Sequence, residues 1–443
     1  MTSIIWASHP LKIDLKKAVA LTVEKNLDIQ NAKASRVSQK YALRASQYEF
    51  ELQNTLTGET TVLDSDKDTT IKNSTTLSPI ASIKNKFGTE FEFSPHISLQ
   101  DGFEPTVAIR QPLIRGFGTQ VVLSDLRSAE QQNDIDRLGY IQTISSAISD
   151  TIVNYIKVIS SQYKIRALKR SLINNRLNLE QAKINFQFGQ VAKSDINDQR
   201  MQVANTLSDI ASGEAEYQNN LNQLKQSINI SNQDLILKDE VESIRSNMRI
   251  PSKEEALAAM TKNNNKLKTL QHTLFQSQQS YIKAKNDLRI ELNVVGTKQL
   301  FHSTDDSNLV VELDVPINNV TKKQALVDAK TNIIQAKQNI QAQQTSIQNQ
   351  ANNLVKELDL LNISVQAQHE QVKLRNQRLA IDQHRLEKGY VSAFEVNERI
   401  KDRDEEIERL QELEIDFSTK LISLYKEMGK TLDHWHVKLP KNY

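Results

Sequence analysis

Apolar residues in the second half of the chain recur at helical spacing over an unusually long stretch. They fall every seven residues, with one step of four in the middle: Leu326, Ile333, Ile340, Ile347, Leu354 and Leu361, then Val365, Val372, Leu379 and Leu386. This is a heptad seam with a stutter, the pattern of packed and supercoiled helices. Because Gln, Asn, Lys and Glu fill most positions between, the apolar stripe is narrow. We therefore expect long, thin helices that expose most of their circumference to water.

Residues that interrupt helices are scarce and unevenly placed. The 443 residues include 11 Gly and 8 Pro, and nine of these lie between Gly58 and Gly118. None lies between Ile317 and Lys388, a stretch that as one helix would span about 108 Å at about 1.5 Å per residue. With only 5% aromatic residues, this composition excludes a turn-rich all-β protein and disfavours a compact α/β enzyme.

The helical pattern repeats at an offset of 200 residues. Ile165, Leu172, Leu179 and Phe186 lead to Gly189, as Val365, Val372, Leu379 and Leu386 lead to Gly389. The match continues after each glycine: Val191 with Val391, Asp195 with Glu395, Ile196 with Val396, Asn197 with Asn397 and Asp198 with Glu398. A lone glycine between two amphipathic patterns, followed by Ser194 or Ser392 as an N-cap, is typical of a helical-hairpin tip. Each half is therefore expected to hold a long helix, a glycine turn and a returning helix.

Other segments alternate apolar and polar residues with a period of two, which predicts strands with one apolar face. They run over Phe87 to Leu99, Ile290 to Val294 and Leu309 to Val315. Such strands suit either a small sheet lying on a core or a transmembrane barrel with a wet lumen. No amphipathic helix wide enough to cover a sheet is left over. Four to six strands cannot close a barrel, and lipid does not tolerate open strand edges, so the membrane interpretation requires several chains in one barrel.

Each strand segment ends at a proline, beyond which a long helix begins. The first exit reads Gln111-Pro112-Leu113-Ile114-Arg115-Gly116-Phe117-Gly118, and the second reads Asp314-Val315-Pro316-Ile317-Asn318. Proline ends a strand ladder because it lacks an N–H donor. We interpret Pro112, Gly116 and Pro316 as junctions between a barrel and a helical tube.

Composition limits the chemistry that the chain can perform. The absence of cysteine excludes disulfides, thiolate metal sites, cysteine nucleophiles and a lipid-modified N-terminal cysteine. The net charge of +2 indicates no nucleic-acid partner. No run approaches 18 apolar residues, so no transmembrane helix is expected. Ile4, Ile5 and Trp6 are too few for the apolar part of a signal peptide, so a signal is either absent or already removed.

No enzyme motif is present. The only close histidine pair is His434 and His436, which lacks a nearby third ligand and fits a surface or docking element better than a metal site. Gly116-Phe117-Gly118 fits a turn better than a nucleotide loop, and no nucleophile elbow or phosphate loop occurs. We expect a protein that is not an enzyme and holds no cofactor and no metal.

Taken in order along the chain, these features resemble the TolC-like outer-membrane efflux protein family. They are an opening helix around Leu15 to Leu43, the QPLIRGFG exit at 111–118, the FGQVAKSDIND tip at 188–198, LDVPINN at 313–319 and KGYVSAFEVNE at 388–398. The resemblance implies a mostly α, α+β homotrimer whose strands form one 12-stranded barrel in outer-membrane lipid. A trimeric periplasmic α-helical barrel would continue it. The implied location is the outer membrane of a Gram-negative bacterium.

The family's function implies specific partners and sites in this chain. It predicts a passive exit duct for efflux or type I secretion, driven by an inner-membrane transporter and joined to it by a periplasmic adaptor. The adaptor would dock at the tips, at Gly189, Val191, Asp195, Gly389 and Val391. Rings of acidic residues narrow the pore in this family, and the matching positions are Glu395 and Glu398, which share one helical face. An ordinary solvated pair is the alternative for them. The family's closing tyrosine and arginine align with Leu386 and Val391, so those gating contacts are not carried over.

These patterns divide the chain into two repeats and two connecting parts. The first repeat, 1–230, contains a helix over 14–48, strands within 50–114, a long helix over 119–188, a tip at 189–193 and a returning helix over 194–229. An equatorial linker covers 231–251. The second repeat, 252–429, contains a helix over 252–288, strands over 289–300 and 308–317, a long helix over 319–388, a tip at 389–393 and a returning helix over 394–429. A tail covers 430–443.

The first strand region is about 35 residues longer than the second. We attribute the surplus to an extra hairpin or a surface loop around Ser65 to Lys86. A soluble coiled-coil adaptor or scaffold is the main alternative function. It would account for the heptads but not for the strands.

Overall fold

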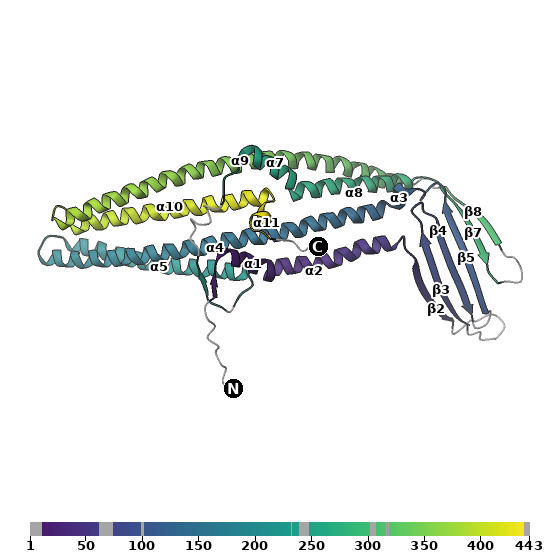
Figure 1. Ribbon diagram of the computed structural model, residues 1–443, viewed down its shortest axis with the longest axis horizontal. Helices are drawn as coiled ribbons and strands as arrows, with labels where there is room; N and C mark the ends of the chain where they lie inside the picture. Colours follow the sequence, from purple (N-terminus) through teal and green to yellow (C-terminus); the bar gives the residue numbers. More distant parts are fainter. Residues whose placement is uncertain are drawn as a thin grey trace, which may run out of the picture. The chain divides into compact units, whose positions relative to one another are not determined.

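The computed structural model describes residues 11–61, 74–98, 102–231, 233–238, 248–301, 307–315, 317 and 319–437 (Figure 1). The chain forms two compact units. Unit 1 comprises Met1–Lys33, Tyr140–Asn264 and Thr345–Tyr443, and unit 2 comprises Ala34–Gly139 and Asn265–Gln344. In the described residues, the regular structure of unit 1 is helical apart from one short strand pair, whereas unit 2 holds the larger sheet.

Four long helices form two hairpins. α4 (Ser124–Gln187) is followed by α5 (Lys193–Ser227), and α9 (Val320–Glu387) is followed by α10 (Ala393–Glu427). The 68 residues of α9 correspond to about 102 Å of helix. The long helix expected over 119–188 is interrupted at its start, where Leu123 separates the short α3 (Thr119–Val122) from α4.

Each helix expected to open a repeat is divided in two at an asparagine. α1 (Leu15–Lys25) and α2 (Leu27–Tyr48) are separated by Asn26, which has ψ near 130°. The Asn26 side-chain oxygen accepts hydrogen bonds from the backbone N–H groups of Asp28 and Ile29, at 3.0 and 3.2 Å, and so caps the new helix. α7 (Lys253–Asn263) and α8 (Asn265–Asp287) are separated at Asn264, whose ψ is near 110°. A heptad pattern does not predict such a break, because it indicates only which face of a helix is apolar.

The heptad seam of α9 lies inward. Ile347, Val365 and Leu379 are buried, and the other seam residues are at most partly exposed. Small residues three or four positions after a seam residue, including Ala329, Ala336 and Ala351, are also buried and widen the packed stripe. A second apolar row stays exposed on the same helix and includes Leu360, Leu374 and Ile381.

The largest hydrophobic core lies in unit 1. The middle of α4 supplies Ile144, Ile148, Ile152, Tyr155 and Ile159, spaced three or four residues apart. Residues from α1, α5 and α10 pack around them. The Tyr155 hydroxyl donates a hydrogen bond to the Ile13 carbonyl at 3.2 Å, so its polar end is satisfied.

A short parallel strand pair completes this core. β1 (Leu11–Ile13) pairs with β6 (Leu235–Leu237) in the register Leu11–Leu235. β6 falls within the segment expected to be the equatorial linker, of which residues 239–247 lie outside the described part. Of the expected tail, α11 (Thr431–His434) is a single helical turn, and residues 438–443 lie outside the described part.

Unit 2 contains one antiparallel sheet of six strands in the order β2-β3-β4-β5-β7-β8. The strands are β2 (Gln53–Thr61), β3 (Ser74–Lys84), β4 (Glu90–Ser98), β5 (Gly102–Pro112), β7 (Glu291–Gln299) and β8 (Ser307–Asp314). The described part of the expected surplus is a strand, β3, which pairs with β4 as a hairpin, and residues 62–73 lie outside the described part. The expected strand over Phe87 to Leu99 begins three residues later, because Phe87 and Gly88 belong to the β3–β4 turn.

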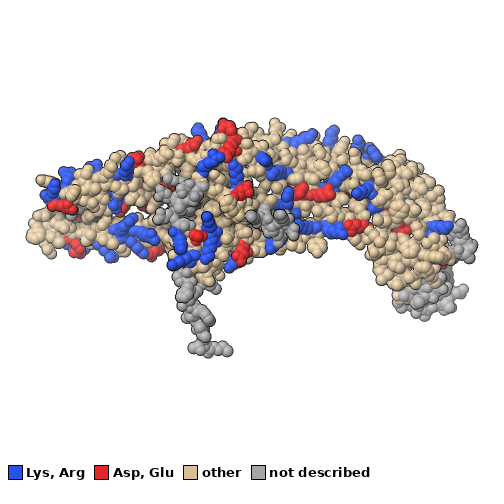
Figure 2. All heavy atoms as spheres, viewed as in Figure 1, with Lys and Arg blue, Asp and Glu red and all other residues tan. Residues whose placement is uncertain are grey.

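The sheet has one apolar and one polar face. Side chains directly across neighbouring strands share a face, as in the series Ile83–Phe91–Ile109–Gly296–Leu309. The same face carries Leu56, Leu77, Phe93, Ile97, Phe103, Val311 and Leu313, all of which are exposed in the single chain. On the edge strand β8, Leu309, Val311 and Leu313 are 76%, 63% and 65% exposed. On the side drawn in Figure 2, few charged side chains lie over the strands, whereas both signs intermingle over the helices.

Three prolines lie inside the sheet. Pro95 of β4 stands directly opposite Pro105 of β5, and Pro79 of β3 stands opposite Leu56. The pairing of β3 with β4 runs over Thr76–Leu77 and again over Ala81–Lys84, and skips the residues around Pro79. The skip follows from the missing N–H donors of Pro79 and Pro95.

Candidate functional site

The two hairpin ends have the same backbone geometry. Gly189 and Gly389 have φ of +72° and +75°, in the left-handed region that favours glycine. The Gly189 N–H bonds the Phe186 carbonyl at 3.0 Å, and the next N–H bonds the Asn185 carbonyl at 2.9 Å. Gly389 and Tyr390 make the equivalent bonds to Leu386 and Arg385, both at 2.9 Å. Both ends are therefore Schellman motifs, which explains why one glycine suffices to end each long helix.

The acidic residues after each glycine cap the returning helix. The Glu395 carboxylate accepts a hydrogen bond from the Ser392 backbone N–H at 3.0 Å, and the Ser392 hydroxyl accepts one from the Glu395 N–H at 3.2 Å. This is a capping box. At the other end the Asp195 carboxylate accepts a bond from the Ala192 N–H at 2.9 Å. Ala192 is the N-cap of α5, so the expectation of Ser194 as this N-cap is wrong; Ser194 lies within the first turn of the helix. The pairing of Asp195 with Glu395 in sequence thus has a local structural reason, whereas their part in a pore or a docking surface remains a prediction.

Glu398 faces a different environment from Glu395. It lines a cavity of about 160 Å³ between α4 and α10, next to Asn397, which donates a hydrogen bond to the Asn178 side chain. Three further carboxylates of α10 line the same cavity: Asp404, Glu405 and Glu408. Lys401 is the one cation among its lining residues. Acidic groups therefore gather where α10 meets α4, beyond the two residues that the sequence singled out.

Glu408 is the most perturbed member of this group. Its partial burial raises the pKa of the carboxyl, and the negative charges of Glu412, Glu405 and Asp209 act in the same direction. Lys164 of α4 acts in the opposite direction. The ionised form of Glu408 is therefore disfavoured in the folded chain relative to an exposed glutamate.

A ladder of ion pairs joins α9 to α10 along the hairpin that ends at Gly389. Arg375 lies 3.4 Å from Asp402 and 3.6 Å from Glu406, and Arg399 lies 3.6 Å from Asp382. The Gln368 amide also donates to the Glu406 carboxylate at 2.8 Å. Because the side chains of Asp382 and Glu406 are only 14% and 15% exposed, these contacts are shielded from solvent more than ordinary surface pairs. The ladder ties the two helices of this hairpin together.

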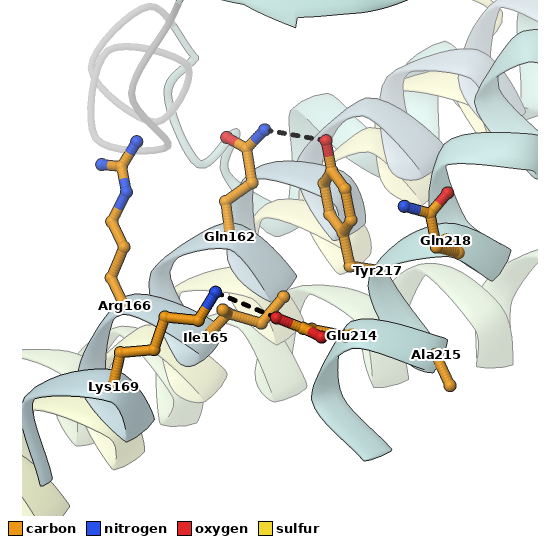
Figure 3. A pocket seen from close by; sticks show the side chains of 8 residues that line it. All are labelled: Gln162, Ile165, Arg166, Lys169, Glu214, Ala215, Tyr217 and Gln218. Atoms are coloured by element: carbon orange, nitrogen blue, oxygen red, sulfur yellow. Dashed lines mark hydrogen bonds and ion pairs between the residues drawn. The ribbon is translucent and has the colours of Figure 1, made fainter. Parts of the chain in front are cut away.

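The first hairpin carries a more open groove between α4 and α5 (Figure 3). Lys169 pairs with Glu214 at 2.9 Å, and the Gln162 amide donates to the Tyr217 hydroxyl at 3.4 Å. Arg166 points away from these pairs in Figure 3. The exposure of Lys169 and Glu214, more than half in each case, makes this pair a weak tie.

The exit from β5 is built from close backbone contacts. Pro112 is the last residue of β5, and the Gly116 N–H then donates to the buried side chain of Asn286 at 3.2 Å. Arg115 forms an ion pair with Glu291 at the start of β7. Gly116 and Gly118 have φ of +83° and +98°, so the turn uses glycine where L side chains are strained. Pro316, the corresponding exit in the second half, lies outside the described residues.

The turn between β3 and β4 packs directly on this exit. The Gly118 N–H donates to the Phe87 carbonyl at 3.2 Å. A Cβ on Gly88 would lie 2.5 Å from the Gly116 carbonyl oxygen and 3.1 Å from Pro112. The Asn85 side chain holds the turn in shape by accepting bonds from the Phe87 and Thr89 N–H groups, at 2.9 and 3.0 Å. We call residues 85–89 and 112–118 together the sheet junction.

The described part of the chain contains no helix apolar enough, over sufficient length, to cross a membrane. Within the same residues, no group of three or more His, Cys, Asp or Glu side chains is arranged to hold a metal ion.

The fold is similar to that of solved channel proteins along most of the chain. The crystal structures of CusC, which address folding and transmembrane channel formation, align with a TM-score of 0.69 over 97% of this chain and 95% of that chain, at 13% identity. The Campylobacter jejuni CmeC outer membrane channel aligns with a TM-score of 0.67 over 94% and 85%, at 13% identity. The open state of the Neisseria gonorrhoeae MtrE outer membrane channel aligns with a TM-score of 0.69 over 94% and 88%, at 14% identity. No family model and no curated protein matches the sequence.

The resemblance inferred from the sequence motifs is thereby confirmed at the level of fold. The chain has the fold of outer-membrane channels of this kind, with long helices and one sheet.

Sequence reasoning missed two parts of the site. Gly88 was assigned to a strand, although Asn85 and Gly88 three residues later are a turn signal. The α9–α10 ladder was missed because Arg375 and Asp402 lie far apart in sequence, and no local pattern indicates which charges meet across a hairpin.

Proposed function

We propose that this chain is the outer-membrane subunit of a tripartite efflux or type I secretion system. In this proposal three copies form a duct that conducts cargo passively from an inner-membrane transporter through the periplasm and the outer membrane. The observation that carries it is the sheet, whose apolar face is exposed in the single chain and whose opposite face is polar. Lipid on one side and a wet lumen on the other satisfy such a sheet.

The strand edges support assembly. Within the described residues, β2 and β8 each have a strand neighbour on one side only. Open edges are not tolerated in lipid, so the edges must meet those of other copies. The exposed apolar row of Leu360, Leu374 and Ile381 on α9 gives the helices a further surface for a neighbouring copy.

The helices fit the periplasmic part of the duct, arranged as two repeats. α4 and α9 are long enough to reach far from the membrane, at about 96 and 102 Å of helix each. We assign adaptor docking to the hairpin ends, at Gly189, Val191 and Asp195 and at Gly389 and Val391. These ends are rigid because Schellman motifs and helix caps define them.

Glu398 is the better candidate of the two for a pore constriction. The Glu395 carboxylate is engaged by the Ser392 backbone, whereas Glu398 joins the acidic residues along α10. Threefold symmetry would bring these carboxylates toward one axis and attract cations. The polar face of the sheet also carries a net negative charge, because its acidic residues outnumber Lys84 and Arg110. These acidic residues are Glu59, Glu90, Glu92, Glu104, Glu291, Glu312 and Asp314.

Purification and bilayer recording test the proposal. We expect a protein that requires detergent, has the mass of a trimer by light scattering, and forms cation-selective channels in planar bilayers. A soluble coiled-coil scaffold would instead be monodisperse without detergent, as a monomer or dimer, and would form no channels.

A further inference from the structure

The sheet contains six strands, which is more than a 12-stranded trimeric barrel can accept from each copy. We infer that all six strands of each copy enter the membrane, so that a trimer closes one barrel of eighteen strands through pairing of β2 with β8 of the next copy. This inference rests on the proposed trimeric channel and concerns the width of its outer end.

The two additional strands, β3 and β4, match their neighbours in length. β3 has 11 residues and β4 has 9, against 9 in β2 and 11 in β5. A tilted strand of about 9 to 11 residues crosses a bilayer. An extramembrane hairpin would have no reason to keep this length.

The additional strands also keep the alternation of the sheet. Leu77 and Ile83 of β3 and Phe91, Phe93 and Ile97 of β4 lie on the apolar face that β5 and β8 share. Thr76, Ser78 and Ser82 of β3 and Glu90, Glu92 and Ser94 of β4 lie on the polar face. Strands that extended into water on both sides would not need an uninterrupted apolar face.

The β3–β4 turn is fixed to the base of the sheet. Its residues contact the exit turn after β5, residues 112–118, through the Gly118–Phe87 hydrogen bond and the close approach of Gly88 to Gly116. The hairpin therefore returns to the end where the chain enters the helices. β3 therefore runs from the opposite end of the sheet to this end, and β4 runs back.

An even number of strands in each copy permits closure. Because every neighbouring pair in the sheet is antiparallel, β2 and β8 run in opposite directions. The β8 strand of one copy and the β2 strand of the next are then antiparallel too, and the barrel closes without a parallel joint.

The consequence is a wider outer end. At a strand spacing of about 4.8 Å and a tilt of about 40°, twelve strands give a backbone diameter of about 24 Å and eighteen give about 36 Å. Subtracting about 5 Å of side chain at each wall leaves lumens of about 14 and about 26 Å. An α-helix with its side chains is about 10 to 12 Å wide, so the wider barrel admits polypeptide with secondary structure.

Cysteine pairs test the arrangement, and the chain has no native cysteine to interfere. In outer membranes, Thr57→Cys with Ser78→Cys should form a disulfide within one copy, because these residues are directly opposite. Thr57→Cys with Thr106→Cys should not, because three strand spacings, about 14 Å, separate β2 from β5. Val310→Cys on β8, combined in turn with Thr55→Cys, Thr57→Cys or Glu59→Cys, covers the unknown register between copies. One of these pairs should give a ladder of disulfide-linked bands on a non-reducing gel, from monomer through dimer to trimer and no further.

The outcomes separate this inference from the proposed function. A disulfide between positions 57 and 106 that replaces the one between 57 and 78, with the trimer ladder intact, would overturn the eighteen-stranded barrel and leave the channel standing. A ladder that stops at dimer, or no ladder with any pair, would overturn the trimer and both proposals with it. As a second readout, polyethylene glycol about 20 Å across, added to the outer side of a bilayer, should enter the pore and lower its conductance. Exclusion of this polymer would contradict the wide lumen.

Discussion

Replacing Gly88 by alanine tests whether the β3–β4 turn is part of the sheet junction. Gly88 has φ of +95°, and a Cβ there would lie 2.5 Å from the Gly116 carbonyl oxygen. The left-handed backbone costs an alanine about 1 to 2 kcal/mol. The clash with the backbone of the exit turn adds about 1 to 3 kcal/mol, because neither turn can move without breaking its hydrogen bonds. We therefore expect Gly88→Ala to destabilise the sheet by about 2 to 5 kcal/mol.

Gly102→Ala is the matched control. Gly102 begins β5 with a similar φ of +87°, but no atom of the described residues lies within 4 Å of the position of its Cβ. It should therefore cost only the backbone strain, about 1 to 2 kcal/mol. The assay is thermal unfolding in detergent, followed by circular dichroism in the β-sheet region. Equal losses for the two variants would refute the contact between the turn and the exit.

Four other substitutions have defined outcomes. Asn85→Ala should lower the thermal midpoint by an amount equivalent to about 1 to 3 kcal/mol, because two backbone N–H groups of the turn lose their acceptor. Arg375→Met should lower the thermal midpoint by an amount equivalent to about 1 kcal/mol, because Asp402 and Glu406 each lose an ion pair and keep Arg399 or Arg409. Glu398→Gln should shift the reversal potential of the channel toward lower cation selectivity without changing the thermal midpoint; an unchanged potential would remove Glu398 from the constriction. Glu408→Gln should raise the thermal midpoint at pH 7.5 by up to about 2 °C, because a carboxyl whose pKa is raised by folding destabilises the folded chain when it is ionised. The difference in midpoint between the variant and the parent should vanish as the pH falls through the raised pKa toward the ordinary glutamate value.

The sequence predicted the helices better than the sheet. Heptad spacing and lone glycines place the two hairpin ends at Gly189 and Gly389, because a helix end depends on a few adjacent residues. The asparagine breaks at Asn26 and Asn264 were missed. Asparagine caps a helix only when the chain around it already bends, so an asparagine alone does not predict the break.

The number of strands could not be read from alternation. β3 contains Pro79, and β4 contains Pro95, which in a sequence argue against an interior strand. The β3–β4 pairing skips the residues around these two prolines, while each strand stays paired with its other neighbour. The role of Glu395 was similarly hidden, because a carboxylate three residues after a serine fits both a capping box and an acidic ring.

An electron cryomicroscopy map of the protein in a lipid nanodisc tests the central claim most directly. The account predicts three copies around one axis, with the apolar face of the sheet toward lipid and the helices outside the disc. A monomer, or a sheet that lies outside the lipid, would contradict it.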